Sequence, residues 1–231
     1  MIFKKTSAIF LLFSCGVMNL FAQSYNHPNF GLKSHETLEI MKVEMAAERT
    51  VISLSIENRI DKGEFCADKN IYILYPDGTK LNIINSTGIP RCPDSFKFRK
   101  IGEKLSFTLV FPKLKSGTKW FDLIEDCNSN CFSFYGVLLN SEMNSNIDEA
   151  VAMVDRGDID SAIGKYKSII ESTGSSDSGV IGSLYSDLIS LQIKKGYKAE
   201  AEAWYKKLAG SAAPRLSLYI KNLNSRGIKF N

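Results

Sequence analysis

Two histidines, His27 and His35, are the only imidazoles that this sequence offers for acid–base or nucleophilic chemistry. A Ser/His/Asp or Cys/His site needs an imidazole that packing holds against its nucleophile. Both histidines come before the first predicted strand, so we expect them in a flexible segment. Glu125 and Asp126 are adjacent carboxylates, but adjacent strand residues point to opposite faces of a sheet. We expect both to be solvated hairpin residues, and the sequence predicts no catalytic residue and no enzyme.

Three acidic residues, Asp155, Asp158 and Asp160, lie close together, as the ligands of a calcium loop do. The glycine and the bidentate Glu of an EF-hand are missing at their required offsets, so helix capping and turns explain these residues better. No glycine-rich phosphate loop follows a predicted strand. The sequence therefore predicts neither a metal site nor a bound cofactor.

Four cysteines, Cys66, Cys92, Cys127 and Cys131, remain if the first 22 residues are removed as an export signal. An even number of cysteines in an exported chain favours disulfides. Cys127 and Cys131 enclose three residues between two predicted strands, so a short hairpin brings their thiols to bridging distance. Cys66 then pairs with Cys92. The alternative is a tetrathiolate zinc site, which requires two closely spaced cysteine pairs, and only one such pair is present.

The first 22 residues have the layout of a secretory signal peptide. A basic start and an apolar stretch over residues 8–13 lead to Ala22. We expect cleavage after Ala22, so that the exported chain begins at Gln23 and is periplasmic or secreted. The alternative is a lipoprotein, because the Leu-Phe-Ser-Cys segment that ends at Cys15 resembles a lipoprotein cleavage box with Cys15 as the acylated residue.

The composition is that of an ordinary globular protein, with 44% hydrophobic and 23% charged residues among 231. The formal net charge of +4 falls to +2 for residues 23–231, because Lys4 and Lys5 belong to the predicted signal. A charge so close to zero gives no argument for binding nucleic acid or an anionic membrane. After the signal, no segment offers the roughly 18 consecutive apolar residues that a transmembrane helix needs.

Residues 38–140 alternate between apolar and polar positions in short runs separated by turn signals, which is typical of a β-sandwich or barrel. The Asp77-Gly78 pair predicts a hairpin with positive φ at both residues. The predicted fold of residues 23–143 is an Ig-like antiparallel sandwich stapled by disulfides. We predict strands at about residues 38–45, 50–57, 70–75, 79–85, 104–111, 119–125 and 132–139, with a short one at 96–99.

From residue 144 onward the apolar spacing changes to the period of an α-helix, and five helices are predicted over residues 144–231. Asn146, followed three residues later by Glu149, matches a capping box, and Asp158 can cap the second helix. Because the period switches at one polar junction, we expect residues 23–143 and 144–231 to be two domains that fold separately.

The helical part resembles tetratricopeptide (TPR) repeats. Gly157, Ala162, Tyr166 and Ile169 stand where the second half of such a repeat has its glycine turn and its packing residues. Gly196, Ala201, Tyr205 and Leu208 repeat the same offsets of 5, 9 and 12 residues. The resemblance implies an all-α domain of TPR-like helical hairpins.

In that family the first helix of each hairpin lines the concave side, where partners bind. Matching the two glycine turns places Ser186, Ser190 and Lys194 on that side, together with Ile147, Val151 and Val154, which must also serve the core. The resemblance therefore implies that Ser186, Ser190 and Lys194 contact a protein partner.

The β part resembles an uncharacterised domain of exported bacterial proteins, in the stretches at residues 56–59, 121–125 and 132–136. This resemblance supports the fold and the compartment and implies no chemistry. Trp204 lies on the apolar stripe of its helix and is expected in the core, whereas Trp120, at a strand start, could stack on a sugar ring.

Two functions are therefore carried forward. The first is an exported, non-catalytic protein-interaction or scaffolding protein, whose TPR-like tail binds another exported or envelope protein. The alternative is a carbohydrate-binding accessory protein that uses the sandwich and Trp120.

Overall fold

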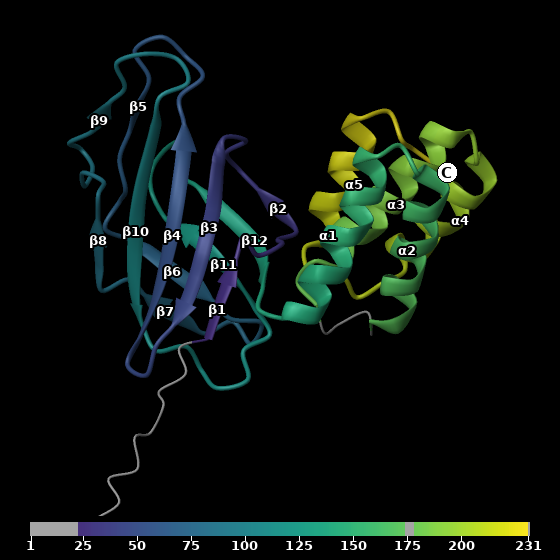
Figure 1. The fold of residues 1–231 in the computed structure, drawn as a ribbon, viewed down its shortest axis with the longest axis horizontal. Coiled ribbons are helices and arrows are strands. Elements are labelled where there is room, and N and C mark those ends of the chain that lie inside the picture. The colour runs from purple at the N-terminus through teal and green to yellow at the C-terminus, as the bar shows by residue number, and fades with distance from the viewer. Residues whose placement is uncertain (1–22, 174–177, 231) are drawn as a thin grey trace, which may run out of the picture.

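The computed structural model of the chain describes residues 23–173 and 178–230. An antiparallel β domain is followed by a domain of helices (Figure 1). The predicted export signal lies outside the described residues. Within the described ranges, no helix is long and apolar enough to cross a membrane.

The first sheet has the strand order β1-β3-β4-β10-β8. Its centre is the pairing of β4 with β10, which runs without interruption from Glu57 opposite Lys104 to Arg49 opposite Pro112. The strands of this sheet are β1 (Gln23–Asn26), β3 (Leu38–Met45), β4 (Arg49–Glu57), β10 (Lys104–Pro112) and β8 (Asn85–Thr87).

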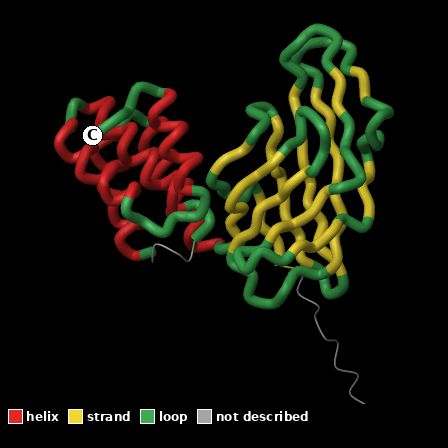
Figure 2. The backbone as a smooth tube through the Cα atoms, turned by 180° about the vertical axis from the view of Figure 1, so that it is seen from behind, coloured by secondary structure: helices red, strands yellow, loops and turns green. Residues whose placement is uncertain are grey.

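The second sheet has the order β2-β12-β11-β6-β7. Its strands are β2 (Leu32–Lys33), β12 (Ser133–Leu138), β11 (Trp120–Glu125), β6 (Ile71–Leu74) and β7 (Lys80–Asn82). A small third sheet pairs β5 (Glu64–Phe65) with β9 (Phe96–Lys97). Figure 2 shows the strands gathered in one body, with the helices in a second body beside it.

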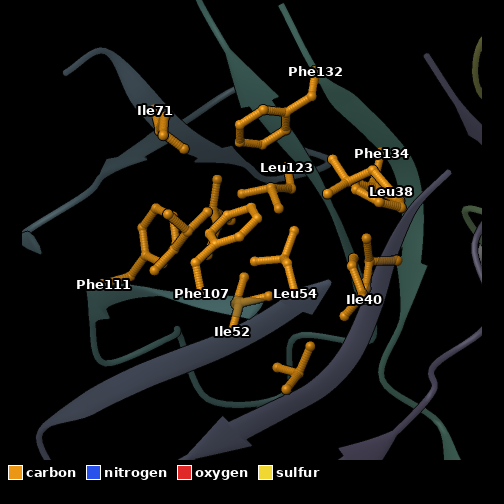
Figure 3. Packing of buried hydrophobic residues seen from close by; sticks show 14 of the residues in the cluster. Leu38, Ile40, Ile52, Leu54, Ile71, Phe107, Phe111, Leu123, Phe132 and Phe134 are labelled. Atoms are coloured by element: carbon orange, nitrogen blue, oxygen red, sulfur yellow. The ribbon is translucent and has the colours of Figure 1, made fainter. Parts of the chain in front are cut away.

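The core of the β domain lies between the two large sheets (Figure 3). Along β10 the side chains of Leu105, Phe107, Leu109 and Phe111 are buried, while Ser106 stays exposed. This is the alternation that the sequence predicts. The inward side chains of β3, β4, β11 and β12, and Phe132 just before β12, complete the core; the strand residues include Leu38, Ile40, Ile52, Leu54, Leu123 and Phe134.

The seven main predicted strands are confirmed as β3, β4, β6, β7, β10, β11 and β12, and the short one as β9. The structure adds β1, β2, β5 and β8, which have only two to four residues each. These segments show no clear alternation of apolar and polar residues, so the sequence pattern does not predict them.

The hairpin at Asp77-Gly78 is confirmed, because β6 pairs with β7, but its turn differs from the prediction. Gly78 has a φ of 81°, whereas Asp77 is outside the positive-φ region. The carboxylate of Asp77 accepts hydrogen bonds from the N–H of Thr79 at 2.9 Å and from its hydroxyl at 2.6 Å. This side chain stabilises a turn that needs only one left-handed residue.

Five helices follow in the described part of the chain. They are α1 (Ser141–Asp155), α2 (Ile159–Ser172), α3 (Ile181–Lys195), α4 (Lys198–Ala209) and α5 (Leu216–Ser225). Their apolar faces form a second core, separate from that of the β domain, around Leu184, Leu188, Ala201, Leu208 and Leu223.

The predicted capping box at Asn146 and Glu149 is wrong, because α1 begins earlier. Asn140 is its N-cap and accepts a hydrogen bond from the N–H of Met143 at 2.9 Å. Asn146 and Glu149 instead lie within α1 and both accept from the ammonium group of Lys165, at 2.8 and 2.6 Å. The predicted cap of α2 is confirmed, since Asp158 accepts from the N–H of Ser161.

The N-terminal segment of the β domain is hydrogen-bonded to α1. The backbone N–H of Asn29 donates to Oδ1 of Asn144 at 2.7 Å, and its side-chain amide donates to Asp148 at 2.9 Å. Asn144 is buried and donates in turn to the carbonyl of Leu138, at the end of β12. Leu138 belongs to the core of the helical domain, so no flexible linker separates the two domains.

A second set of contacts joins α5 to the β domain. The side chain of Tyr219 is 1% exposed and lies so close to Gly31 and to Gly182 of α3 that a Cβ at either glycine would overlap it. Arg215, just before α5, forms an ion pair with the buried Asp122 of β11. Its guanidinium also lies 4.2 Å from the ring centre of Tyr135. The two domains are therefore held together by apolar, polar and charged contacts.

Candidate functional site

A pocket of about 580 Å³ opens at one end of the β domain, beside β5 and β9. Its walls come from the end of β4, the turn at residues 58–63, the segments around both disulfides and the residues just before β3. The lining side chains that the argument uses are His35, Arg59, Glu64, Phe65, Asp68 and Glu125. A volume of this size lies within the range of small-molecule sites.

Two disulfides form part of the pocket wall, and both predicted pairings are confirmed. Cys66 is bonded to Cys92, and Cys127 is bonded to Cys131. The first bridge joins the chain after β5 to the chain before β9, where the N–H of Cys92 also donates to the carbonyl of Ala67 at 3.1 Å. The second closes the turn between β11 and β12. These covalent links limit the movement of the loops that surround the pocket.

The ring of Phe65 is half-buried and contributes an aromatic wall. Its centre lies 6.1 Å from that of His35 and 6.1 Å from that of Phe107 in the core. The sequence predicts a flexible segment for His35, but the structure packs its ring edge-on against Phe65. Burial lowers the pKa of His35 below its usual value, so the imidazole is neutral at neutral pH. His27 is exposed and lines none of this pocket.

The neighbouring Ser34 and His35 are in hydrogen-bond contact, with 2.9 Å between Oγ and Nδ1. A Ser–His contact can indicate an activated nucleophile. Here the Ser34 oxygen also accepts from the N–H of Ser133 at 2.8 Å and lies 3.2 Å from the carbonyl of Cys131. The hydroxyl therefore fixes the edge of β12, and the contact gives no support for nucleophilic chemistry.

The prediction that Glu125 is a solvated hairpin residue is wrong, because Glu125 is buried and only 6% exposed. Its carboxylate accepts hydrogen bonds from the backbone N–H groups of Asp68, at 2.7 Å, and Phe132, at 3.0 Å. Burial raises the pKa of Glu125, while these two hydrogen bonds oppose the shift. Asp126 is exposed, as predicted. The burial of Glu125 could have been inferred from the two-residue period of β11, which puts Phe121, Leu123 and Glu125 on the same face.

Of the three predicted partner-binding residues, the structure exposes one fully. Lys194 is exposed and Ser190 is half-buried, both on one stripe of α3. Ser186 is buried, and its hydroxyl donates to the carbonyl of Gly182 at 2.8 Å, so its contact with a partner stays a prediction. The physical reason for this burial is the position of α5, whose Tyr219 packs on the face of α3 that carries Gly182.

Both tryptophans are buried. Trp204, 7% exposed, packs against Tyr185 in the helical core, as predicted. Trp120 is 8% exposed, and its indole lies against Gly179, where a Cβ would overlap the ring. Trp120 therefore belongs to the contact between the two domains, and it also lines a pocket of about 370 Å³ at the start of β11.

Two of the three acidic residues compared above with a calcium loop, Asp158 and Asp160, have structural partners. Asp158 caps α2, and Asp160 is bonded to the ammonium group of Lys195 at 2.9 Å and to the hydroxyl of Tyr197 at 3.2 Å. Within residues 23–173 and 178–230, no group of three or more His, Cys, Asp or Glu side chains could hold a metal ion. Comparisons of the chain with protein-family models, with curated proteins and with solved structures find no match.

Proposed function

We propose that this chain is an exported, non-catalytic protein-interaction protein, with an Ig-like sandwich that carries a TPR-like helical domain. In this proposal the helical domain binds another exported or envelope protein. Two disulfides favour an oxidising compartment and are compatible with export.

The helical domain supports the TPR-like assignment at the positions that the resemblance uses. Gly157 and Gly196 have φ values of 79° and 84° and lie in the turns before α2 and α4. Ala162, Tyr166 and Ile169 of α2 are buried, as are the corresponding residues of α4. Each glycine thus ends one helix so that the next can pack back against it.

The proposed binding surface is the exposed stripe of α3, formed by Ser183, Asp187, Ser190 and Lys194 and called the α3 surface below. The hydroxyls of Ser183 and Ser190 donate to backbone carbonyls of their own helix, at 2.7 and 2.6 Å. Asp187 is solvent-accessible, but the protein groups packed around it raise its pKa to about 6, and Arg226, beyond the end of α5, opposes this shift. The surface therefore offers a carboxylate, an ammonium group and small side chains between them.

One observation carries the proposal: the α3 surface is the polar stripe of a helix whose other faces are buried. Because α3 also contacts Tyr219, which reaches the β domain, the stripe is held in a fixed position. A rigid polar surface is suited to recognising a partner with little loss of conformational entropy on binding.

The test places a photo-crosslinking amino acid at position 190 or 194 in the chain expressed in its native host. We expect one exported or envelope protein to be crosslinked from both positions. The variant Lys194→Glu should weaken that crosslinking, because it reverses a charge at the surface, and should change the free energy of unfolding by less than about 0.5 kcal/mol.

The matched control is Lys198→Glu, which reverses an exposed charge at the start of α4, outside the α3 surface. A crosslinker at the exposed Glu171 of α2 serves as the positional control. Equal crosslinking from positions 171, 190 and 194, or an equal effect of the two lysine variants, would contradict the proposal.

The compartment is tested by the intact mass of the protein recovered from its host. We expect a chain that begins at Gln23, which is also the first residue of β1. A mass that corresponds to a diacylated chain beginning at Cys15 would support the lipoprotein alternative instead.

A further inference from the structure

The pocket beside the disulfides carries more negative than positive charge. Among the described residues that line it, four have carboxylates, Glu57, Glu64, Asp68 and Glu125, and Arg59 is the only lysine or arginine. Glu57 has cationic partners, since it lies 3.5 Å from the ammonium group of Lys104 and 3.8 Å from Arg59. Within the described part of the chain, Glu64, Asp68 and Glu125 form no ion pair.

Glu125 is the most informative of these residues because it is buried. A buried carboxylate is costly unless a positive charge or several hydrogen bonds stabilise it. Glu125 has two backbone N–H donors, while the carboxylate of Asp68 repels it. Within the described part of the chain no cation pairs with Glu125, so its charge depends on these two hydrogen bonds for stabilisation.

The remaining walls are apolar and aromatic. Phe98 and Ile56 are buried, and the half-buried ring of Phe65 faces the same cavity. The neighbouring His35 is neutral at neutral pH and so does not compensate the carboxylates. An aromatic ring beside carboxylates favours a cation, because the ring face attracts positive charge. A bare metal ion fits less well, since no group of three or more His, Cys, Asp or Glu side chains among the described residues could hold one.

We propose that this pocket binds a ligand with an ammonium or guanidinium group on an apolar stem. The cationic group lies among Glu64, Asp68 and Glu125, and the stem lies along Phe65. The volume of about 580 Å³ accommodates a group as large as an arginine side chain with its backbone. This site is separate from the α3 surface, and the inference does not rest on the function proposed above.

Arginine and citrulline are the first pair of probes, because they have nearly the same shape and only arginine has a charged side chain. The readout is the ¹H–¹⁵N NMR spectrum of the full exported chain with its disulfides intact. The backbone amides of Asp68 and Phe132 donate to Glu125 and therefore report directly on its carboxylate. We expect arginine to shift both signals in a saturable way and citrulline to leave them unchanged.

Two variants test the carboxylates. Glu64→Gln removes an exposed charge of the pocket and should weaken arginine binding by about three-fold. Glu125→Gln should weaken it by more than about ten-fold, because this charge is buried. The matched control is Asp126→Asn, which removes the same charge from the exposed neighbour of Glu125 and should leave the affinity unchanged. Since Glu64→Gln changes an exposed side chain, it tests the proposal even if Glu125→Gln fails to fold.

The source of the cationic group is distinguished by a third probe, arginine blocked as an acetyl amide. Tighter binding of the free amino acid identifies a free amine or amino acid as the ligand, whereas equal or tighter binding of the blocked form identifies a basic side chain of a peptide.

The proposal is overturned if arginine and citrulline shift the two amides equally, if neither shifts them, or if Asp126→Asn weakens binding as much as Glu64→Gln.

Discussion

Asp122 of β11 forms an ion pair with Arg215, which lies 93 residues later, immediately before α5. The carboxylate of Asp122 also accepts the N–H of Gly136 at 2.7 Å, and its side chain is 6% exposed. Arg215 has a φ of 58°, in the left-handed region that most residues avoid. The ion pair thus holds a residue of unusual backbone conformation at the contact between the two domains.

The first prediction concerns this ion pair. Arg215→Met keeps an unbranched side chain but removes the guanidinium from Tyr135 and leaves the buried carboxylate of Asp122 without its cation, so we expect the free energy of unfolding to fall by about 2–3 kcal/mol. Urea denaturation measures this change. Lys221→Met, at an exposed position of α5, is the control and should change stability by less than about 0.5 kcal/mol. Equal effects of the two variants would contradict this prediction.

The second prediction compares two glycines within helices. Gly182→Ala adds a methyl group that overlaps the ring of Tyr219, so we expect a loss of about 1–3 kcal/mol despite the better helix propensity of alanine. Gly164 of α2 has no atom within 4 Å of the added Cβ, and Gly164→Ala should stabilise the protein by about 0.5–1 kcal/mol. Thermal unfolding of both variants gives the comparison. Stabilisation by both would show that α5 does not pack on α3 as described.

The third prediction concerns Gln192, which is fully buried in α3 and whose two side-chain amide atoms have no hydrogen-bond partner. Gln192→Met keeps the length of the side chain and removes both polar atoms. Because an unsatisfied buried polar group costs about 1–3 kcal/mol, this variant should raise the free energy of unfolding. Gln192→Glu, which has the same shape and a charge, should lower it strongly. A destabilising effect of methionine would show that the amide is paired in solution.

The fourth prediction concerns the pH dependence at His35. In the folded chain, burial lowers the pKa of His35 below 6.5, the ordinary value that applies in the unfolded chain. At pH values between the folded and the unfolded pKa, the unfolded chain therefore binds more protons than the folded one. The contribution of His35 to stability is therefore present above pH 6.5 and decreases as the pH falls through the folded pKa. An NMR titration of the imidazole should give a midpoint below 6.5, and Phe65→Ala should move it upward by hydrating the ring. A midpoint at or above 6.5 would disprove the packing described for this side chain.

Sequence periodicity predicted the long elements because each buries one regular face. The strands around Ile52 and Phe107 alternate strictly, and the helix around Leu188 repeats every three to four residues. The disulfides followed from cysteine number and spacing in the same local way. These features depend on neighbours in the sequence, which a pattern can detect.

The candidate pocket and the contact between the domains could not be predicted in this way. Glu125 is buried because it hydrogen-bonds the backbone of Asp68, 57 residues earlier, and no local pattern encodes that pairing. Ser186 is buried because Tyr219 covers its face of α3. Independent folding of residues 23–143 and 144–231 stays a prediction, although Leu138 of β12 and Leu32 of β2 complete the helical core.

The N-terminal segment from β1 to β2 has a consequence for the timing of folding. Synthesis produces it first among the described residues, yet Asn29 is bonded to Asn144, 115 positions later, and Gly31 lies against Tyr219. Long separations of this kind slow folding, because a large loop must close before the contact forms. Asn29 and Gly31 therefore cannot complete their contacts until α1 and α5 have been synthesised, although the neighbouring β1 can pair earlier with β3. The contact between the two domains is thus expected to form late, after most of the described chain has left the ribosome.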